Sequence, residues 1–194
     1  MIYTINADQR SGSMPVYEFE GKRPRIDVTA YVSPEATIIG DVVIGKGCYI
    51  APGARLRGDW GAIVVGPFSN VQENCVIHAA PDETVILAER SHIGHGAVLH
   101  GPVLEEHVVV GMGAIIMDDV KIGAGSCIGA GALVTTGTVI PPGRLFLGVP
   151  AKDHGKVDKE MEKYLEYATG VYIALPPRCF KGLVPLDMKN VLTE

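Results

Sequence analysis

The chain has 194 residues and a net charge of −5, with 24 glycines, 13 prolines and few aromatic residues. This length suits one domain with a substantial core. The acidic balance and the lack of a basic face argue against a nucleic-acid partner. Because there is no run of about 18 apolar residues and no signal segment, we expect a cytoplasmic protein that does not enter a membrane.

The chain opens with a segment that lacks any repeat, and we expect residues 1–15 to be an N-terminal extension. From residue 16, Tyr17 and Phe19 alternate with glutamates, which predicts a short opening strand.

A six-residue repeat then fills the chain to about residue 145. Apolar residues recur at every sixth position, as at Val32, Ile38, Ile44, Ile50 and Leu56, and again at Leu104, Val110, Ile116, Ile122, Ile128, Val134 and Ile140. Such hexads are typical of a parallel β-helix, in which three hexads form one triangular coil. We expect this domain to span residues 16–146. From the repeat type we also expect left-handed coils.

The middle of the repeat contains longer steps, which we interpret as small loops near Trp60-Gly61 and Pro81-Asp82-Glu83. The four cysteines form no Cys-x-x-Cys pair, and Cys48 and Cys127 lie inside hexads. We therefore predict packed free thiols.

The repeat ends in a Gly- and Pro-containing segment, Leu147 to Lys152. Beyond it, apolar residues recur at three- and four-residue steps: Val157, Met161, Tyr164, Leu165, Ala168 and Tyr172. This spacing predicts an amphipathic α-helix, which we expect to stop at Pro176-Pro177. Residues 147–180 are thus a closing segment with a C-terminal α-helix, and 181–194 form a tail. The fold class is all-β with one helix.

Three histidines have informative positions in the repeat. His78 and His100 directly follow the inward residues Ile77 and Leu99, which lie three faces apart, so their side chains should stack on adjacent coils. Stacked strands lie roughly 4.8 Å apart, which suits two ligands of one metal ion. His95 belongs to the preceding face. One chain cannot easily gather all three, so we predict a metal site at a subunit interface of a trimer.

Three neutral imidazoles leave one coordination position for water, which is typical of a catalytic site, and the pKa of that water falls to about 7. The alternative is that these are ordinary surface histidines. His92 is the main rival ligand, but its position favours a supporting or surface role. We expect His107 and His154 to be surface residues without partners.

Their positions in the repeat make four further residues candidates for a functional role. Gln72 shares the position of His78 one face earlier, so its amide could orient the nucleophile, and Glu73 could accept a proton or steer a substrate. The alternative is that Gln72 and Glu73 are solvated corner residues. Arg57 and Asp59 share a strand face, which allows an ion pair between subunits or a solvated pair.

These motifs resemble the γ-class carbonic anhydrases over about residues 16–180. The matching segments are Leu56-Arg57-Gly58-Asp59, Asn70 to His78, His92 to Gly101, Val110 to Ala114 and Gly148 to Lys152. The resemblance implies a left-handed β-helix homotrimer with Zn²⁺, or Co²⁺ or Fe²⁺, between subunits. It makes His78, His95 and His100 the metal ligands and assigns the metal-bound hydroxide to Gln72. It also implies that Arg57 and Asp59 pair across the interface and that Glu73 orients the substrate.

Within that family the chain resembles the subgroup that contains the phenylacetate-degradation protein PaaY and the carnitine-operon protein CaiE. The segment around Tyr172 supports this, and Tyr172 is a candidate catalytic residue beside the metal, although a structural role is equally open. Efficient members carry a glutamate where this chain has Trp60, and an acidic loop for which only Asp82 and Glu83 could substitute. We therefore expect weak reversible hydration of CO2 to bicarbonate. Metal-dependent hydrolysis of acyl-CoA thioesters is the alternative, followed by CoA-dependent acyl transfer or a non-catalytic trimeric scaffold.

Overall fold

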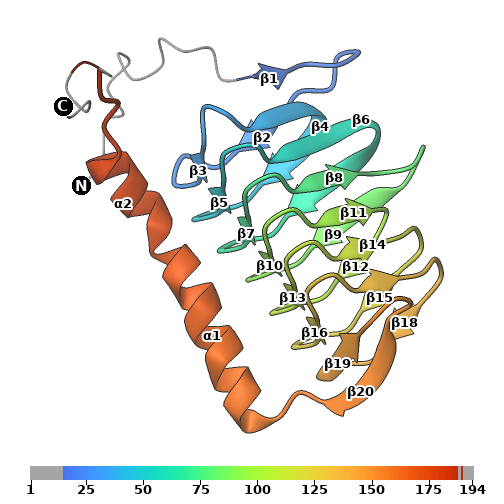
Figure 1. Ribbon diagram of the computed structural model, residues 1–194. Coiled ribbons are helices and arrows are strands. Elements are labelled where there is room, and N and C mark those ends of the chain that lie inside the picture. The colour runs from blue at the N-terminus through green and yellow to red at the C-terminus, as the bar shows by residue number, and fades with distance from the viewer. Residues whose placement is uncertain (1–14, 188, 190–194) are drawn as a thin grey trace.

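A computed structural model describes residues 15–187 and 189, which form a parallel β-helix with two α-helices along one side (Figure 1). The predicted fold class is confirmed. Each coil has three faces, and every strand of the coils pairs in parallel with the strands of the coils above and below.

The first face contains β1 (Val16–Tyr17), the first halves of β4 (Thr37–Ile44) and β6 (Arg55–Val65), then β8 (Val76–His78), β11 (Val98–His100), β14 (Ile115–Ile116) and β17 (Leu133–Val134). The second contains β2 (Arg25–Ile26), the second halves of β4 and β6, then β9 (Thr84–Leu87), β12 (Val103–Leu104), β15 (Lys121–Ile122) and β18 (Val139–Ile140). The third contains β3 (Tyr31–Val32), β5 (Tyr49–Ile50), β7 (Asn70–Val71), β10 (His92–Ile93), β13 (Val109–Val110), β16 (Cys127–Ile128) and β19 (Arg144–Leu147).

The hexad residues point into the coil and form its core. Ile77, Leu99 and Ile116 pair in register on successive coils and are completely buried. Burying each such side chain stabilises the fold by about 1.5–3 kcal/mol. The corners need residues that tolerate a left-handed backbone, and Gly113 (φ 66°) and Asn74 (φ 60°) are two of them.

Two details of the coils differ from the prediction or extend it. The expected loop near Trp60-Gly61 is wrong, because β6 continues without interruption through this corner from one face to the next. Gly61 permits the close approach of the next coil at this corner, since a Cβ there would lie 2.3 Å from the Glu83 carbonyl oxygen. The parallel stack ends where β19 pairs antiparallel with β20 (Lys152–Lys156), and Arg144 of β19 forms an ion pair with Asp153 of β20.

The predicted helix is confirmed as α1 (Lys159–Ile173), which begins after Asp158, whose carboxylate accepts from two backbone N–H groups of the first turn. The prolines do not end the helical segment, however. After a break at Ala174, Pro176 and Pro177 lie in the first turn of a second helix, α2 (Leu175–Gly182). Proline is tolerated there because first-turn N–H groups have no partner within the helix.

The helices run back along the β-helix from β20 toward β3 (Figure 1). Tyr31, Tyr49 and Ala51 of the third face pack against Tyr172, Leu175 and Cys179. All four cysteines are free, and Cys48, Cys75 and Cys127 are buried, so the predicted packed thiols are confirmed. No helix within the described residues is long and apolar enough to cross a membrane.

Candidate functional site

His78 and His100 lie side by side on the first face. They pair in register at the ends of β8 and β11, as the repeat predicts. His78 Nδ1 lies 3.0 Å from His100 Nε2, and the ring centroids are 5.0 Å apart. Two nitrogens bound to one tetrahedral zinc ion lie roughly 3.3 Å apart, given Zn–N bonds of about 2.05 Å. The pair therefore has a spacing suited to two ligands of one ion.

The other nitrogen of each ring faces a carboxylate. His78 Nε2 lies 3.0 Å from Asp59 Oδ1, and His100 Nδ1 contacts Asp118 Oδ1. When each ring donates its N–H to its carboxylate, the two nitrogens that face one another both present lone pairs. Such an arrangement repels unless a cation, either a shared proton or a metal ion, lies between them. The donor set thus fits a divalent ion.

Asp59 is also bound by Arg57, whose Nη1 lies 2.5 Å from Asp59 Oδ2. Burial opposes ionisation of Asp59, but the hydrogen bonds from Arg57 and His78 hold its pKa below its usual value. The Arg57–Asp59 pair, expected across an interface, forms within one chain here. Trp60 is 56% exposed, and its ring centroid lies 5.3 Å from that of His78. The Arg57 guanidinium lies over the Trp60 ring, 5.7 Å from its centroid.

His95 lies at the corner that follows β10. Its Nδ1 lies 2.5 Å from Glu73 Oε2, and its Nε2 lies 3.4 Å from the Tyr172 hydroxyl of α1. Burial and the neighbouring Glu73 carboxylate raise the pKa of Tyr172, so this hydroxyl remains protonated at neutral pH. The structure thus brings together three of the candidates from the sequence, and like the other two histidines His95 has one nitrogen on a carboxylate.

Gln72 directly precedes Glu73 and is only 1% exposed. The alternative that Gln72 is a solvated corner residue is therefore wrong. Its Nε2 donates to Asn70 Oδ1 at 2.9 Å and lies 2.8 Å from His92 Nε2. Burial, followed by the nearby His95, lowers the pKa of His92 from 6.5 to about 4, so its ring is neutral at physiological pH. His92 therefore supports Gln72 and is not exposed to solvent as a free surface residue.

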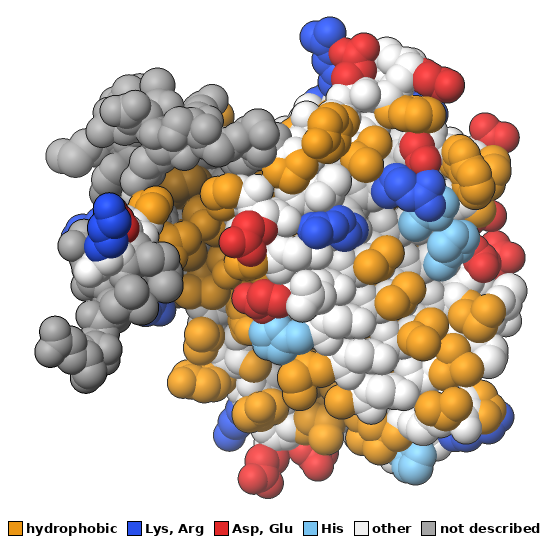
Figure 2. Space-filling model, turned by 45° about the horizontal axis from the view of Figure 1, so that its top comes forward, with side chains coloured by type: hydrophobic (Ala, Val, Ile, Leu, Met, Phe, Trp, Pro, Cys, Tyr) orange, Lys and Arg blue, Asp and Glu red, His pale blue; other side chains and the backbone are white. Residues whose placement is uncertain are grey.

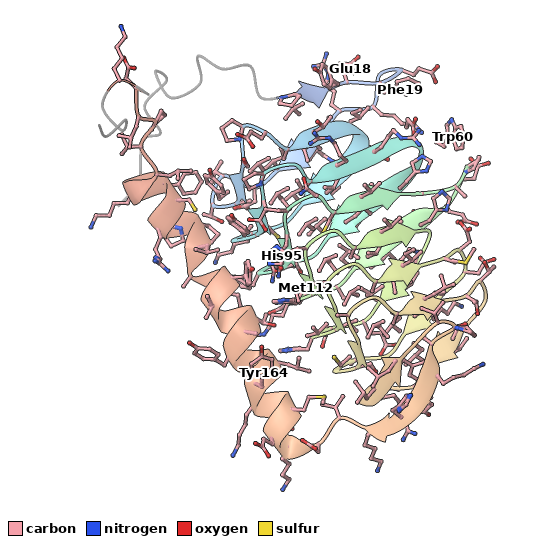
Figure 3. All side chains as sticks on the ribbon, viewed as in Figure 1. Glu18, Phe19, Trp60, His95, Met112 and Tyr164 are labelled. Carbon is pink, nitrogen blue, oxygen red and sulfur yellow. The ribbon has the colours of Figure 1, made fainter. Side chains whose placement is uncertain are left out.

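The candidates therefore form two separate groups in one chain. The first consists of Arg57, Asp59, His78, His100 and Asp118; the second consists of Asn70, Gln72, Glu73, His92, His95 and Tyr172. Figure 3 shows His95 on the side facing α1, whereas Trp60, which contacts His78, lies at a distant edge. Among residues 15–187 and 189, no group of three or more His, Cys, Asp or Glu side chains is placed to hold a metal ion. A complete three-histidine site thus needs a second chain.

Two features escaped the sequence reasoning. Asp118 follows inward Ile116 by two residues, whereas His100 follows the paired Leu99 by one, so counting places Met117 opposite His100 and does not find the contact of Asp118 with His100. The expectation that His107 has no partner is wrong: its Nδ1 accepts from Arg90 Nε at 3.2 Å, and Arg90 in turn contacts Glu166 of α1. Arg90 and His107 both have a left-handed backbone at equivalent corners of successive coils, and this stacking brings their side chains together.

The chain is similar to characterised and solved proteins along most of its length. Residues 101–136 match the family "Bacterial transferase hexapeptide (six repeats)". The chain is 40% identical to the carnitine operon protein CaiE of Proteus sp. (strain LE138) over 171 residues, 88% of this chain and 87% of that protein. It is 39% identical to CaiE of Escherichia coli (strain K12) over 170 residues, again 88% and 87%.

Two solved structures share the fold. A putative acetyltransferase of Bacillus cereus is 34% identical with a TM-score of 0.83, covering 85% of this chain and 96% of that one. A hexapeptide transferase family protein of Anaplasma phagocytophilum is 37% identical with a TM-score of 0.81, covering 84% and 97%. These matches confirm the predicted resemblance to the subgroup that contains CaiE. The chain belongs to the hexapeptide-repeat family of the carnitine operon protein CaiE.

Proposed function

We propose that the chain forms a homotrimer in which His78 and His100 of one subunit and His95 of the next hold a divalent ion, with zinc the expected metal. The observation that carries this proposal is the pair of nitrogens, His78 Nδ1 and His100 Nε2, that face one another at 3.0 Å while carboxylates occupy their other nitrogens. Hexapeptide-repeat proteins are typically trimeric, which fits a site built from two chains.

An apolar strip beside the histidine pair supports a subunit contact on the first face. Val76, Val98 and Ile115 pair in register, point outward and are 41%, 36% and 44% exposed. Exposed apolar residues stacked in a continuous column are typical of an association surface. Figure 2 shows histidine side chains near basic and acidic side chains on one face, with hydrophobic side chains beside them.

A divalent ion held there by three imidazoles would lower the pKa of a bound water to about 7 and would thus supply a hydroxide nucleophile at neutral pH. The protein's own groups prepare the ligands for this. Asp59, Glu73 and Asp118 each hold one ring nitrogen and so fix the tautomer and direction of the other. Glu73 and the Tyr172 hydroxyl, both beside His95, are placed to orient a substrate.

We propose reversible hydration of CO2 as the reaction, at a low rate. CO2 needs no large pocket, and a nucleophile with its proton acceptor is sufficient. The slow step is the removal of the proton that regenerates the nucleophile. Trp60 beside His78 cannot accept this proton, since an indole N–H only donates.

Hydrolysis of acyl-CoA thioesters at the same site is the second candidate, and the exposed indole of Trp60 favours it. An aromatic surface 5.3 Å from His78, with Arg57 against it, is suited to an apolar acyl group or a charged CoA moiety. The solved relative from Bacillus cereus carries the name putative acetyltransferase. Acyl transfer without a metal would instead use the His95–Glu73 pair as a general base.

The test compares metal content with two assays on the purified chain. We expect about one zinc ion per chain, CO2 hydration in a stopped-flow pH-indicator assay, and loss of activity on chelation with recovery on adding zinc. A thioester panel measured by thiol release separates the second candidate from the first. A chain that is fully active after complete chelation would overturn the metal-dependent proposal and favour acyl transfer.

A further inference from the structure

His92 lies half-buried between the candidate site and helix α1. It pairs in register with Asn70 of β7, and the Tyr172 ring packs edge-on against it, at 5.2 Å and 90°. Its Nε2 lies 2.8 Å from Gln72 Nε2, and its Nδ1 lies 3.3 Å from Asn70 Nδ2 and 3.5 Å from Thr169 Oγ1. None of the functions discussed above uses this residue directly.

These contacts determine where the proton of His92 lies. A neutral imidazole carries one N–H and one acceptor nitrogen, and an amide nitrogen can only donate. The shortest contact joins His92 Nε2 to the Gln72 amide nitrogen, so Nε2 is the acceptor. The proton is then on Nδ1, where the Thr169 hydroxyl oxygen can accept it at 3.5 Å. The Asn70 amide nitrogen, 3.3 Å from the same Nδ1, makes no hydrogen bond to it in this tautomer, because both groups donate. The depressed pKa of His92, about 4, agrees with a ring that remains neutral.

The same contacts determine the orientation of Gln72. One amide hydrogen goes to Asn70 Oδ1 and the other to His92 Nε2, so both are used. Within the described part of the chain, no group donates to Gln72 Oε1. Gln72 is therefore held with its carbonyl oxygen as the available atom.

We propose that His92 is a positioning residue that fixes the Gln72 amide so that Gln72 acts only as a hydrogen-bond acceptor toward the reacting group; this rests on the proposed function. The Gln72 carbonyl oxygen would accept a hydrogen bond from the attacking hydroxide. The lone pair of the hydroxide oxygen would then remain free to attack the carbon of the substrate. With the amide turned over, the NH2 group would donate to that lone pair and weaken the nucleophile. Through Thr169 and Tyr172, helix α1 holds His92 in this state.

The first experiment measures the tautomer in the metal-free protein. The nitrogen spectrum of ¹⁵N-histidine-labelled protein, with His92 assigned by its absence in His92→Gln, should show the directly bonded proton on Nδ1 at pH 7. A proton on Nε2 would overturn the proposal whatever the activity of the enzyme, because Nε2 could then not accept from Gln72.

The second experiment uses zinc-loaded protein in the assay in which the wild type is active. His92→Phe retains the ring but removes the acceptor, and we expect a roughly tenfold lower kcat with unchanged KM and zinc content. His92→Gln, which restores an acceptor oxygen, should recover most of this loss, and exposed His154→Phe should have no effect. Should His92→Phe fail to fold, Thr169→Val is expected to lower kcat in the same direction.

Normal zinc binding with wild-type kcat in His92→Phe, or in Thr169→Val if the former does not fold, would overturn the positioning role alone. A wild-type chain that binds no zinc and has neither activity would instead defeat the proposed function, and with it the role of Gln72 toward a reacting group. The two failures are thus distinguishable.

Discussion

Nδ1 of His78 and Nε2 of His100 face one another at 3.0 Å across two adjacent coils, while Asp59 and Asp118 occupy the opposite nitrogens. The carboxylates turn the facing nitrogens into two acceptors that need a cation between them. Both histidines are fixed by the register of the β-helix, so this half of the site exists before any second subunit binds.

Replacing Asp118 by Asn should weaken zinc binding by about 10- to 100-fold, because the carboxylate that holds the His100 N–H becomes a neutral amide, which accepts more weakly and can also turn its NH2 group toward the ring. Competition with a fluorescent zinc chelator measures the affinity. The neighbouring Asp119, which is exposed, provides the matched control, and Asp119→Asn should bind zinc as the wild type does. Equal affinities for the two variants would show that Asp118 has no role at the site.

Replacing Trp60 by Glu should raise the rate of CO2 hydration by about tenfold, since a carboxylate beside His78 can accept the proton that an indole cannot. Trp60→Phe, which keeps an aromatic ring, serves as the control and should leave the rate unchanged. Stopped-flow measurement at several buffer concentrations checks this, because external buffer should help the wild type more than Trp60→Glu. An unchanged rate in both variants would mean that proton removal is not limiting.

The pKa of His92, lowered from 6.5 to about 4 by burial and then by His95, makes stability depend on pH. The unfolded chain binds the proton near pH 6.5 and the folded chain does so only near 4, so the unfolded state holds more protons between these values. Stability must therefore fall as the pH falls from 6.5 to 4. In metal-free His92→Gln this contribution should disappear, as urea unfolding at fixed protein concentration can measure. Parallel pH profiles for the two proteins would contradict the shift.

Gly58 should not tolerate a side chain. A Cβ at this position would lie 2.5 Å from the Asp41 carbonyl oxygen on the neighbouring coil, so Gly58→Ala should destabilise the fold by about 1–3 kcal/mol. Gly170 in α1 has open space around its Cβ position, and Gly170→Ala should be neutral or stabilise the fold by up to about 1 kcal/mol. Thermal unfolding of the two variants is the measurement, and similar melting temperatures would contradict the argument.

Much of the fold could be predicted because the hexads have a fixed period. Counting inward residues placed Ile77 opposite Leu99. Because His78 and His100 directly follow these two residues, the same count placed the two histidines opposite one another. The same count does not show how a corner is built, which is why the β6 corner was expected to be a loop. A pair of prolines can likewise follow the end of a helix or stand in the first turn of one, and the sequence alone does not decide between these outcomes. Here the prolines lie in the first turn of α2, which packs against Tyr31 and Tyr49.

The site was less predictable than the fold. Its histidines could be found by position, but hydrogen-bond partners such as Thr169 come from a helix 77 residues away from His92 in sequence. No repeat relates α1 to the coils, so its contacts with His92 and His95 depend on how the helix packs. The role of His92 therefore became visible only with the side chains in place.

Complementation between two inactive chains tests the central claim most directly. A His95→Ala chain retains His78 and His100, whereas a His78→Ala/His100→Ala chain retains His95, and neither should bind zinc alone. When they are unfolded together and refolded at equal amounts, random trimers should contain an intact site at about one quarter of their interfaces. We expect the refolded mixture to retain about one quarter of the zinc bound by wild-type trimer. A mixture that binds no more zinc than its two components would contradict a site shared between subunits.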